Sequence, residues 1–176
     1  MSVSDTINTS YRCVGLETIK MGDVGGKGGI LGTSLITIKN IVSGSAFFAF
    51  EAPGKNEFFC EDSDYADVIT NTPGAKFIEF SVRDMSPEIF KLAFGGTSAG
   101  TCWSAYYATA TVVSEQSIIA TSKDYGGDKL RLYITRAAVR AGGDLRFSKT
   151  ETGTVTFTCE VLLPETITPP LQVAIT

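Results

Sequence analysis

The sequence has no histidine among its 176 residues. Histidine is the commonest general base in enzymes and a frequent ligand of zinc and related metals. Its absence excludes Ser-His and Cys-His catalysis as well as the usual zinc sites. We therefore expect no enzyme activity, no catalytic residue, no metal site and no cofactor.

Charged residues are also scarce: they make up 19% of the chain, and the net charge is −4. Soluble domains contain about 25% charged residues on average. Proteins that grip nucleic acid usually present a basic face, which this acidic composition does not favour. A soluble chain so poor in charge often covers part of its surface with copies of itself or with partners.

The chain lacks a CxxC pair, and its four cysteines (Cys13, Cys60, Cys102 and Cys159) lie far apart. We expect them to be reduced, buried hydrophobic side chains rather than a disulfide framework. The start of the sequence has no apolar core behind a basic segment, so no signal peptide is expected. The long uncharged run after Lys91 is rich in glycine, serine and threonine, which makes it a poor membrane span.

The most prominent pattern in the sequence is the alternation of apolar and polar residues, which predicts half-buried strands. In "KFIEFSVRD" the inward residues are Ile78, Phe80 and Val82. "KLRLYITR" and "GTVTFTCEVLL" alternate in the same way. Further strands are expected at 12–20, 34–41, 45–51, 58–61, 102–113, 116–121 and 145–149, with turns at "PGKN", "TPG", "DYGGD" and "AGGD". The length fits one domain, residues 1–176.

One short helix is expected at about residues 86–94, in "DMSPEIFKLAFGG". Ser86 is the expected N-cap, Pro87 suits the first helical position, and Glu88 complements the positive helix end. Ile89 and Leu92 belong to an apolar stripe, and two glycines then end the helix. The predicted architecture is a mainly β sandwich or barrel with this helix packed on it and a long glycine-rich loop near the N-terminus.

The glycine-rich stretch "DVGGKGGILG" at residues 23–32 resembles a phosphate-binding loop only superficially. A Walker loop requires serine or threonine after Gly-Lys, but Gly28 follows Lys27. The residues that follow are predicted to form a strand, so no helix N-terminus is available to bind an anion. The stretch is therefore interpreted as a flexible loop.

Two other clusters admit a chemical interpretation and a structural one. Glu61, Asp62, Asp64 and Asp67 depart from the calcium-loop pattern, which favours a solvated acidic loop or interface edge over a cation site. Trp103, Tyr106 and Tyr107 are interpreted as a packing cluster, with a stacking platform for sugars or bases as the alternative.

The order of these segments carries a family resemblance. A glycine-rich loop follows the first strand, and the acidic "EDSDYADV" follows the middle strands. Then come "PGAKFIEFSVRDMSPEIFKLAFGG", further strands and the proline-rich "LLPETITPPLQV". This order resembles the tail tube (major tail) proteins of tailed bacteriophages, and the type VI secretion tube protein is similar in architecture.

The resemblance implies a structural virion protein in six-fold rings that stack head to tail around a lumen for DNA. Implied partners are further copies of the chain, the tape measure protein, the tail terminator and baseplate or tail-tip proteins. DNA would only pass through, and no membrane insertion is implied. The implied location is the tail of the virion, with assembly in the host cytoplasm. No catalytic residue comes with this family.

On this interpretation the loop residues have a role between subunits: we expect them to fold against a neighbouring copy, with Ile30 and Leu31 as apolar anchors. The residues concerned are Asp23, Gly25, Gly26, Lys27, Gly28, Gly29, Ile30 and Leu31. The acidic residues would line an interface or the lumen. Two alternatives remain open, namely a tail terminator or neck protein that forms a single ring and a carbohydrate-binding β-sandwich.

Overall fold

The computed structural model describes residues 13–26, 30–59, 61, 66–105, 114–148, 151–165 and 169–176. Within these residues the chain is mainly β, with antiparallel sheets and one short helix, as the alternating sequence predicts. The elements are β1 (Leu16–Asp23), β2 (Ile36–Ile38), β3 (Phe47–Phe50), β4 (Gly54–Phe59), β5 (Ala66–Thr72), β6 (Lys76–Val82), α1 (Pro87–Phe94), β7 (Thr97–Ala99), β8 (Cys102–Ser104), β9 (Ser114–Ser122), β10 (Leu130–Phe147), β11 (Thr152–Val161) and β12 (Leu171–Ile175).

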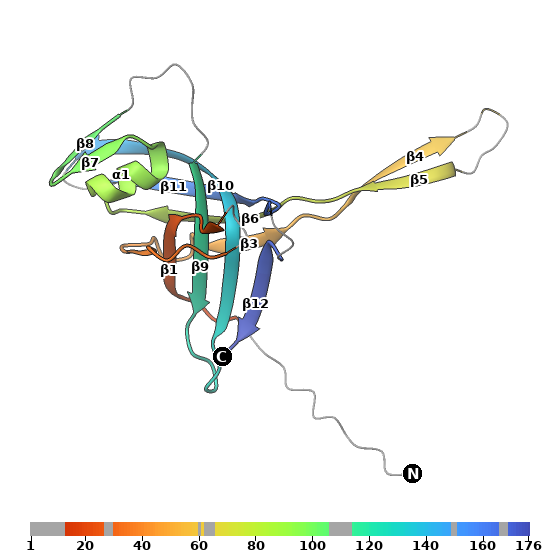
Figure 1. Cartoon of the computed structure of the whole chain (residues 1–176), viewed down its shortest axis with the longest axis horizontal. Coiled ribbons are helices and arrows are strands. Elements are labelled where there is room, and N and C mark those ends of the chain that lie inside the picture. Colours follow the sequence, from red (N-terminus) through yellow and green to blue (C-terminus); the bar gives the residue numbers. More distant parts are fainter. Residues whose placement is uncertain are drawn as a thin grey trace, which may run out of the picture.

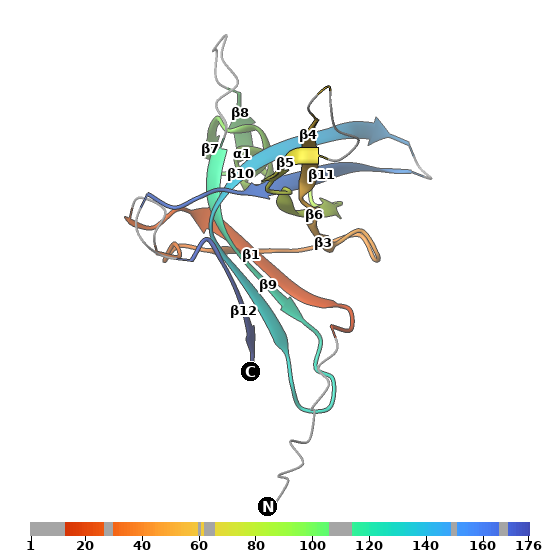
Figure 2. The same ribbon diagram turned by 90° about the vertical axis from the view of Figure 1, so that its right-hand side faces the viewer.

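The main sheet has the strand order β2-β1-β9-β10-β11-β6-β3, with β12 also paired to β10. The long strand β10 connects two halves of this sheet. Its first part, up to Ile134, pairs with β9 and β12, whereas its later part, from Ala137, pairs with β11 and the start of β9. The register shifts between these two residues, as at a β-bulge, which bends a strand. Figure 2 shows the two halves diverging from β10.

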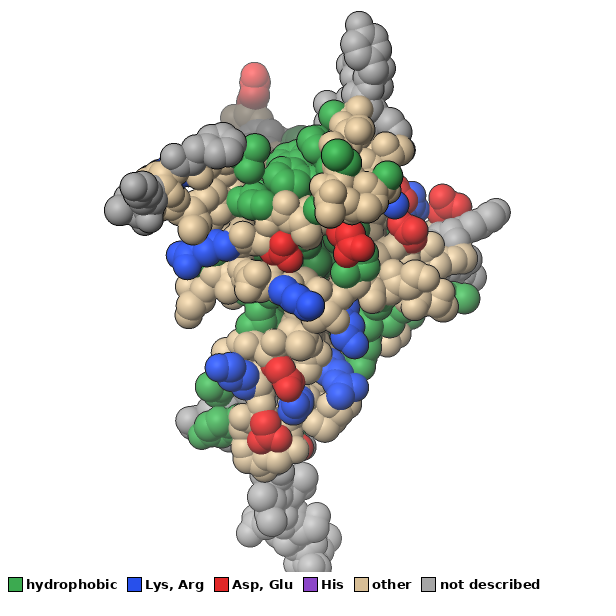
Figure 3. Space-filling view, turned by 90° about the vertical axis from the view of Figure 1, so that its left-hand side faces the viewer, with side chains coloured by type: hydrophobic (Ala, Val, Ile, Leu, Met, Phe, Trp, Pro, Cys, Tyr) green, Lys and Arg blue, Asp and Glu red, His purple; other side chains and the backbone are tan. Residues whose placement is uncertain are grey.

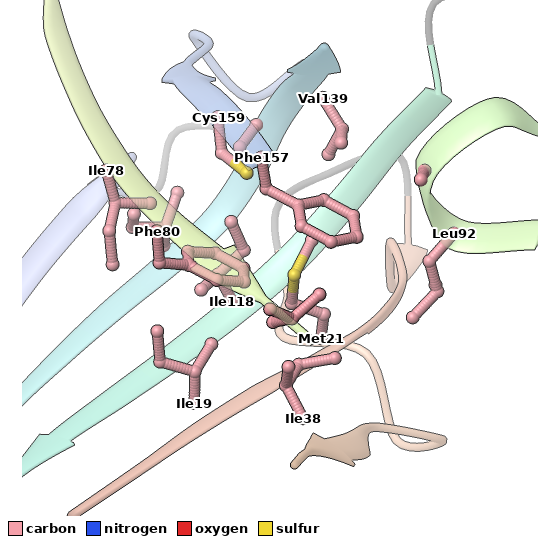
Figure 4. Packing of buried hydrophobic residues seen from close by; sticks show 14 of the residues in the cluster. Ile19, Met21, Ile38, Ile78, Phe80, Leu92, Ile118, Val139, Phe157 and Cys159 are labelled. Carbon is pink, nitrogen blue, oxygen red and sulfur yellow. The ribbon is translucent and has the colours of Figure 1, made fainter. Parts of the chain in front are cut away.

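The core lies where the two halves face each other. Ile19, Met21, Ile118 and Ile134 come from one half and are fully buried. From the other half come Ile78, Phe80, Val82, Val155, Phe157 and Cys159, each at most 3% exposed. The rings of Phe80 and Phe157 stack with centroids 5.1 Å apart, and Figure 4 shows them among the aliphatic residues of β1 and β9. The inward residues predicted from alternation in β6 are thus confirmed, and those of β11 are buried as far as Cys159, whereas Val161 is half-buried.

Helix α1 packs against β10, and Ile89 and Leu92 of the predicted apolar stripe are buried together with Ala93. Pro87 occupies the start of the helix and Glu88 its first turn, as expected. Ser86 is the N-cap residue, but its side chain makes no capping hydrogen bond. Its backbone N–H instead donates to Asp84 Oδ1 at 3.0 Å. At the other end the predicted glycine stop is confirmed by Gly95, which has a positive φ of 72°.

Several expectations about the strands are wrong. "PGKN" is not a turn, because Gly54–Asn56 already lie in β4, and "AGGD" lies inside β10 rather than between two strands. Three strands, β5, β7 and β12, were not expected. The expected strand 102–113 is described only as the short β8, and residues 106–113 lie outside the described part. The described strands do not close into a barrel.

Candidate assembly surface

The most prominent surface feature is a two-stranded arm made of β4 and β5. These strands pair only with each other, and the arm projects away from the body of the molecule (Figure 1). Phe58 lies directly opposite Val68, and their side chains are 57% and 48% exposed. Ile69 of the same arm is 54% exposed. An isolated hairpin buries little apolar surface, so these side chains are available to a partner.

Two residues of the acidic segment are described, and both lie at the end of this arm. Glu61 is exposed just beyond β4, and Asp67 belongs to β5, although its side chain is not described. Asp62 and Asp64 lie outside the described residues. The structure therefore describes one acidic side chain of this segment, that of Glu61, at the end of the arm.

A groove of about 1180 Å³ opens between the two halves of the sheet. Leu16, Phe48, Ala120 and Leu132 contribute to its apolar wall, and Phe47, Phe50 and Val173 lie on it with roughly half or more of each side chain exposed. These residues come from β1, β3, β9, β10 and β12. The groove exists because the described sheet does not close between β3 and β12.

Two lysines, Lys39 and Lys123, also line this groove. Both are exposed, and in the described part of the chain neither forms an ion pair. Glu17, which lines the same groove, is already paired with Lys129 at 2.7 Å. The described lining of the groove therefore carries positive charge that no described ion pair compensates.

The main sheet ends in strands whose outer edges have no described partner. β2, β3 and β12 each pair on one side only, and none contains a charged residue. Phe47 and Phe50 of β3 and Val173 and Ile175 of β12 are 42–62% exposed. Monomeric proteins usually protect such edges with lysine, proline or a covering segment. These edges are suited to pairing with another chain.

The glycine-rich loop begins at Asp23, the last residue of β1, which pairs with Gln116 of β9. Gly25 and Ile30 form an isolated β-bridge, and the Gly32 N–H donates to Ser117 Oγ at 3.1 Å. A Cβ on Gly32 would stand 1.8 Å from Asp23 O, so this position requires glycine. The loop is thus folded back on β1 and β9 at both ends.

The proposed anchors of this loop differ in exposure: Ile30 is 67% exposed, whereas Leu31 is half-buried. Gly26 has a positive φ of 33°. Lys27, Gly28 and Gly29 lie outside the described residues. A role of the loop between subunits stays a prediction.

Trp103 packs on the helix rather than forming an open platform. Its ring stacks on Phe90 with centroids 5.3 Å apart, and its Nε1 donates to Gly95 O at 2.8 Å. Phe94 lies beside it and is 43% exposed. Figure 3 shows hydrophobic side chains gathered on the side of the molecule that carries α1, β7 and β8. Tyr106 and Tyr107 lie outside the described residues.

The expectation that all four cysteines are buried is wrong. Cys13 and Cys102 are free and exposed, and only Cys159 is buried among the described cysteines. Burial raises the pKa of the Cys159 thiol to about 12, so this group stays protonated. Cys60 lies outside the described residues.

An ion-pair network ties the chain together at the bulge of β10. Arg136 donates from Nε and Nη2 to the two carboxylate oxygens of Glu115, each at 2.8 Å. It also donates from Nη1 to the carbonyl of Leu163 at 3.3 Å, and Glu165 lies 3.6 Å away. The hydrogen bonds from Arg136 hold the pKa of Glu115 below its ordinary value. This network connects β9 and β10 to the segment before β12.

The described residues contain no group of three or more potential metal ligands. Among the same residues, no helix is long and apolar enough to span a membrane. The features that the molecule does present are apolar edges, an apolar arm and a groove, which are suited to binding another polypeptide.

Sequence reasoning found the acidic segment and the glycine-rich loop but missed both the arm and the groove. The arm had a usable signal, because "FF" and "VIT" flank the acidic residues as two apolar runs flank a hairpin loop. The groove had none, since its wall combines residues from across the chain. No protein-family model matches the sequence, and no curated protein matches it.

Proposed function

We propose that the protein is a structural subunit that assembles with copies of itself into the tail tube of a tailed bacteriophage. The observation that carries this proposal is the set of uncharged, apolar edge strands, above all β3 and β12. Edges of this kind are a liability in a lone domain, whereas pairing between neighbouring subunits in a ring removes them. The resemblance to tail tube proteins supports the same assembly.

The contacts available to the chain also favour growth beyond a dimer. The edges of β3 and β12 are different surfaces of one molecule, so an interface that joins them leaves one of each free on every complex. Such heterologous interfaces generate closed rings or open filaments. The net charge of −4 suits a conduit through which DNA must slide, because negative charge repels the phosphates instead of binding them.

Negative-stain electron microscopy of the purified protein, together with sedimentation velocity, tests this proposal. We expect rings and tubes with a central lumen. Lysine substitutions on the edges, Ile175→Lys in β12 and Ala49→Lys in β3, are expected to prevent assembly because they place a charge where strands would pair. Leu163→Lys is the matched control, since Leu163 is 79% exposed and lies outside the strands.

Three outcomes contradict the proposal in different ways. A protein that remains monomeric at high concentration would refute self-assembly. Rings that never stack would favour the tail terminator or neck alternative. Tubes formed equally well by the edge variants would show that the edges of β3 and β12 are not the assembly surfaces.

A further inference from the structure

We propose that the groove is a binding site for one anionic amphiphile, namely a long-chain fatty acid. Its carboxylate lies beside Lys39 and Lys123, and its aliphatic tail lies along the apolar floor of the groove. The site goes beyond the proposed tube function, because each chain carries it by itself.

The floor of the groove is a row of directly paired aliphatic residues that crosses the sheet. The register aligns one residue from each of β2, β1, β9, β10 and β12, and directly paired residues share one face of a sheet. These residues are Ile38, Ile19, Ala120, Leu132 and Val173. All but the fully buried Ile19 line the groove. The groove is thus an open continuation of the core, and its floor is apolar for the same reason.

The length of this row fits an acyl chain. Neighbouring strands lie about 4.8 Å apart, so a row across these five strands spans roughly 19 Å. The hydrocarbon core of a bilayer is about 30 Å thick, so the acyl chain of one leaflet spans about 15 Å. The volume of about 1180 Å³ also accommodates such a chain, since pockets for small ligands typically measure about 300–1,000 Å³.

The floor of the groove requires no hydrogen-bonding partner. Among the described residues, the buried side-chain polar atoms without a hydrogen bond are Gln116 Oε1 and Arg131 Nε, and neither residue lines the groove. Ser122 does line it, but its Oγ donates to Lys123 O at 3.0 Å and accepts from the Leu130 N–H at 2.9 Å. A polar ligand would gain little from this floor, whereas an aliphatic tail leaves no buried polar group unpaired.

The wall that faces the row belongs to the other half of the sheet and is aromatic. Phe47, Phe48 and Phe50 of β3 line it, and the rings of Phe48 and Phe50 meet edge to face with centroids 4.7 Å apart. A tail held between this wall and the row removes exposed apolar surface of both from water, which favours binding. The groove is concave, so it admits a single molecule rather than a bilayer surface.

The polar end of the site is provided by Lys39 and Lys123, which lie on the two sides of the start of β1. Lys39 directly follows Ile38, whose partner is Ile19 of β1. The Lys123 N–H donates to Gly15 O at 3.2 Å, and a Cβ on Gly15 would stand 3.4 Å from Lys123 Cδ, so the lysine side chain lies beside this glycine. Neither lysine forms an ion pair within the described part of the chain. Two such ammonium groups beside an apolar groove attract an anionic head group.

Isothermal titration calorimetry with laurate, below its micelle-forming concentration, tests the site. We expect one laurate per chain, an affinity that falls as salt is added, and a negative heat-capacity change from the burial of apolar surface. Three probes are matched controls. Lauryl alcohol has the same tail without charge, lauryltrimethylammonium reverses the charge, and acetate has the carboxylate without the tail. Each should bind at least about tenfold more weakly than laurate.

Two variants locate the ligand in the groove. The first combines Lys39→Gln with Lys123→Gln and removes both head-group partners, and the second, Val173→Glu, places a carboxylate where the tail lies. Each should weaken laurate binding at least about tenfold, and circular dichroism verifies the fold, since all three side chains are exposed. Lys20→Gln and Gln172→Glu are the matched controls. They make the same changes at exposed positions of β1 and β12 that do not line the groove, and they should bind laurate like the wild type.

Three results would overturn the inference. If dilute wild-type protein binds no laurate and Val173→Glu weakens self-association in sedimentation velocity, the occupant of the groove is a second copy of the chain. Laurate binding that both variants leave unchanged would place the ligand elsewhere. Equal affinity for laurate and lauryl alcohol would show that the lysines do not select an anion.

The measurement also separates the site from the tube proposal. A protein that binds laurate as expected but never forms tubes retains the site and refutes only the tube proposal. A protein that forms tubes but binds no laurate refutes only the site.

Discussion

Two adjacent glycines in β10 offer a direct test of the course of this strand. Gly142 pairs with Thr156 and Gly143 pairs with Val155, and neither has a positive φ. A Cβ added to Gly142 meets no atom within 4 Å. A Cβ added to Gly143 would stand 2.5 Å from Thr154 O and 3.0 Å from Val155 Cα. The two positions are neighbours in sequence but opposite in the space available to a side chain.

The expected effects therefore have opposite signs. Gly142→Ala should stabilise the protein by about 0.4–1 kcal/mol, because alanine restricts the unfolded chain and fits the extended backbone. Gly143→Ala should destabilise it by about 1–3 kcal/mol, because the methyl group pushes against backbone that the β11 ladder holds in place. In a chain of this length each kcal/mol corresponds to a change in Tm of about 2–4 °C.

Thermal and urea unfolding of dilute protein, followed by circular dichroism, measures the difference. Each variant is compared with the wild type at the same protein concentration, because self-association raises the apparent stability. Equal effects at the two positions would refute the continuous β10–β11 ladder and would favour the turn that "AGGD" indicates in the sequence.

Three further predictions concern the core, the thiols and the ion pairs. Phe157→Ala should lower the free energy of unfolding by about 3–5 kcal/mol in urea titrations, because its ring is fully buried; a loss below 1 kcal/mol would contradict the packing. Cys159 should react with a maleimide only after unfolding, whereas the two exposed thiols should react in the native protein, as peptide mass mapping would show. Arg136→Ala should lower the Tm at pH 7, because it removes the ion pair with Glu115 and the hydrogen bond to the Leu163 carbonyl, whereas Arg140→Ala, which removes an exposed pair, should change little. Because the pKa of Glu115 is lowered in the folded state, the part of the Arg136→Ala effect that comes from the ion pair should be full above the ordinary pKa of Glu115 and should be lost as the pH falls through the folded-state pKa; an effect of the same size at every pH would show that the ion pair is not its cause.

The local sequence pattern was sufficient to locate strands that alternate strictly between apolar and polar residues, and a helix whose ends are marked by characteristic residues. β6 and β11 were located with the correct buried faces because one apolar face per strand leaves a period of two in the sequence. Helix α1 was located because proline, an acidic first turn and glycines mark its two ends. "DYGGD" was correctly interpreted as a turn, and Gly126 and Gly127 both have positive φ there.

Local pattern failed where glycine or proline served a different purpose from the usual one. "AGGD" lies within a continuous strand because Gly143 gives the β11 backbone room to approach, which no local rule reveals. β12 follows Pro169 and Pro170 and is held in place by β10 and by the backbone bond from the Thr135 N–H to Pro170 O. Its partners are distant in sequence, so its pairing is a tertiary property.

The sequence by itself determined the β-rich class, the inward faces of the regular strands and the position of the helix, since these depend on side-chain period and on residues close in the chain. Only the tertiary structure decided that the sheet stays open between β3 and β12, that β4 and β5 form a projecting arm with Glu61 at its end, and that Lys39 and Lys123 border an apolar groove. Each of these depends on which distant strands pair and where β10 bends. Long-range pairing is selected by the packing of the whole core, which no short segment encodes.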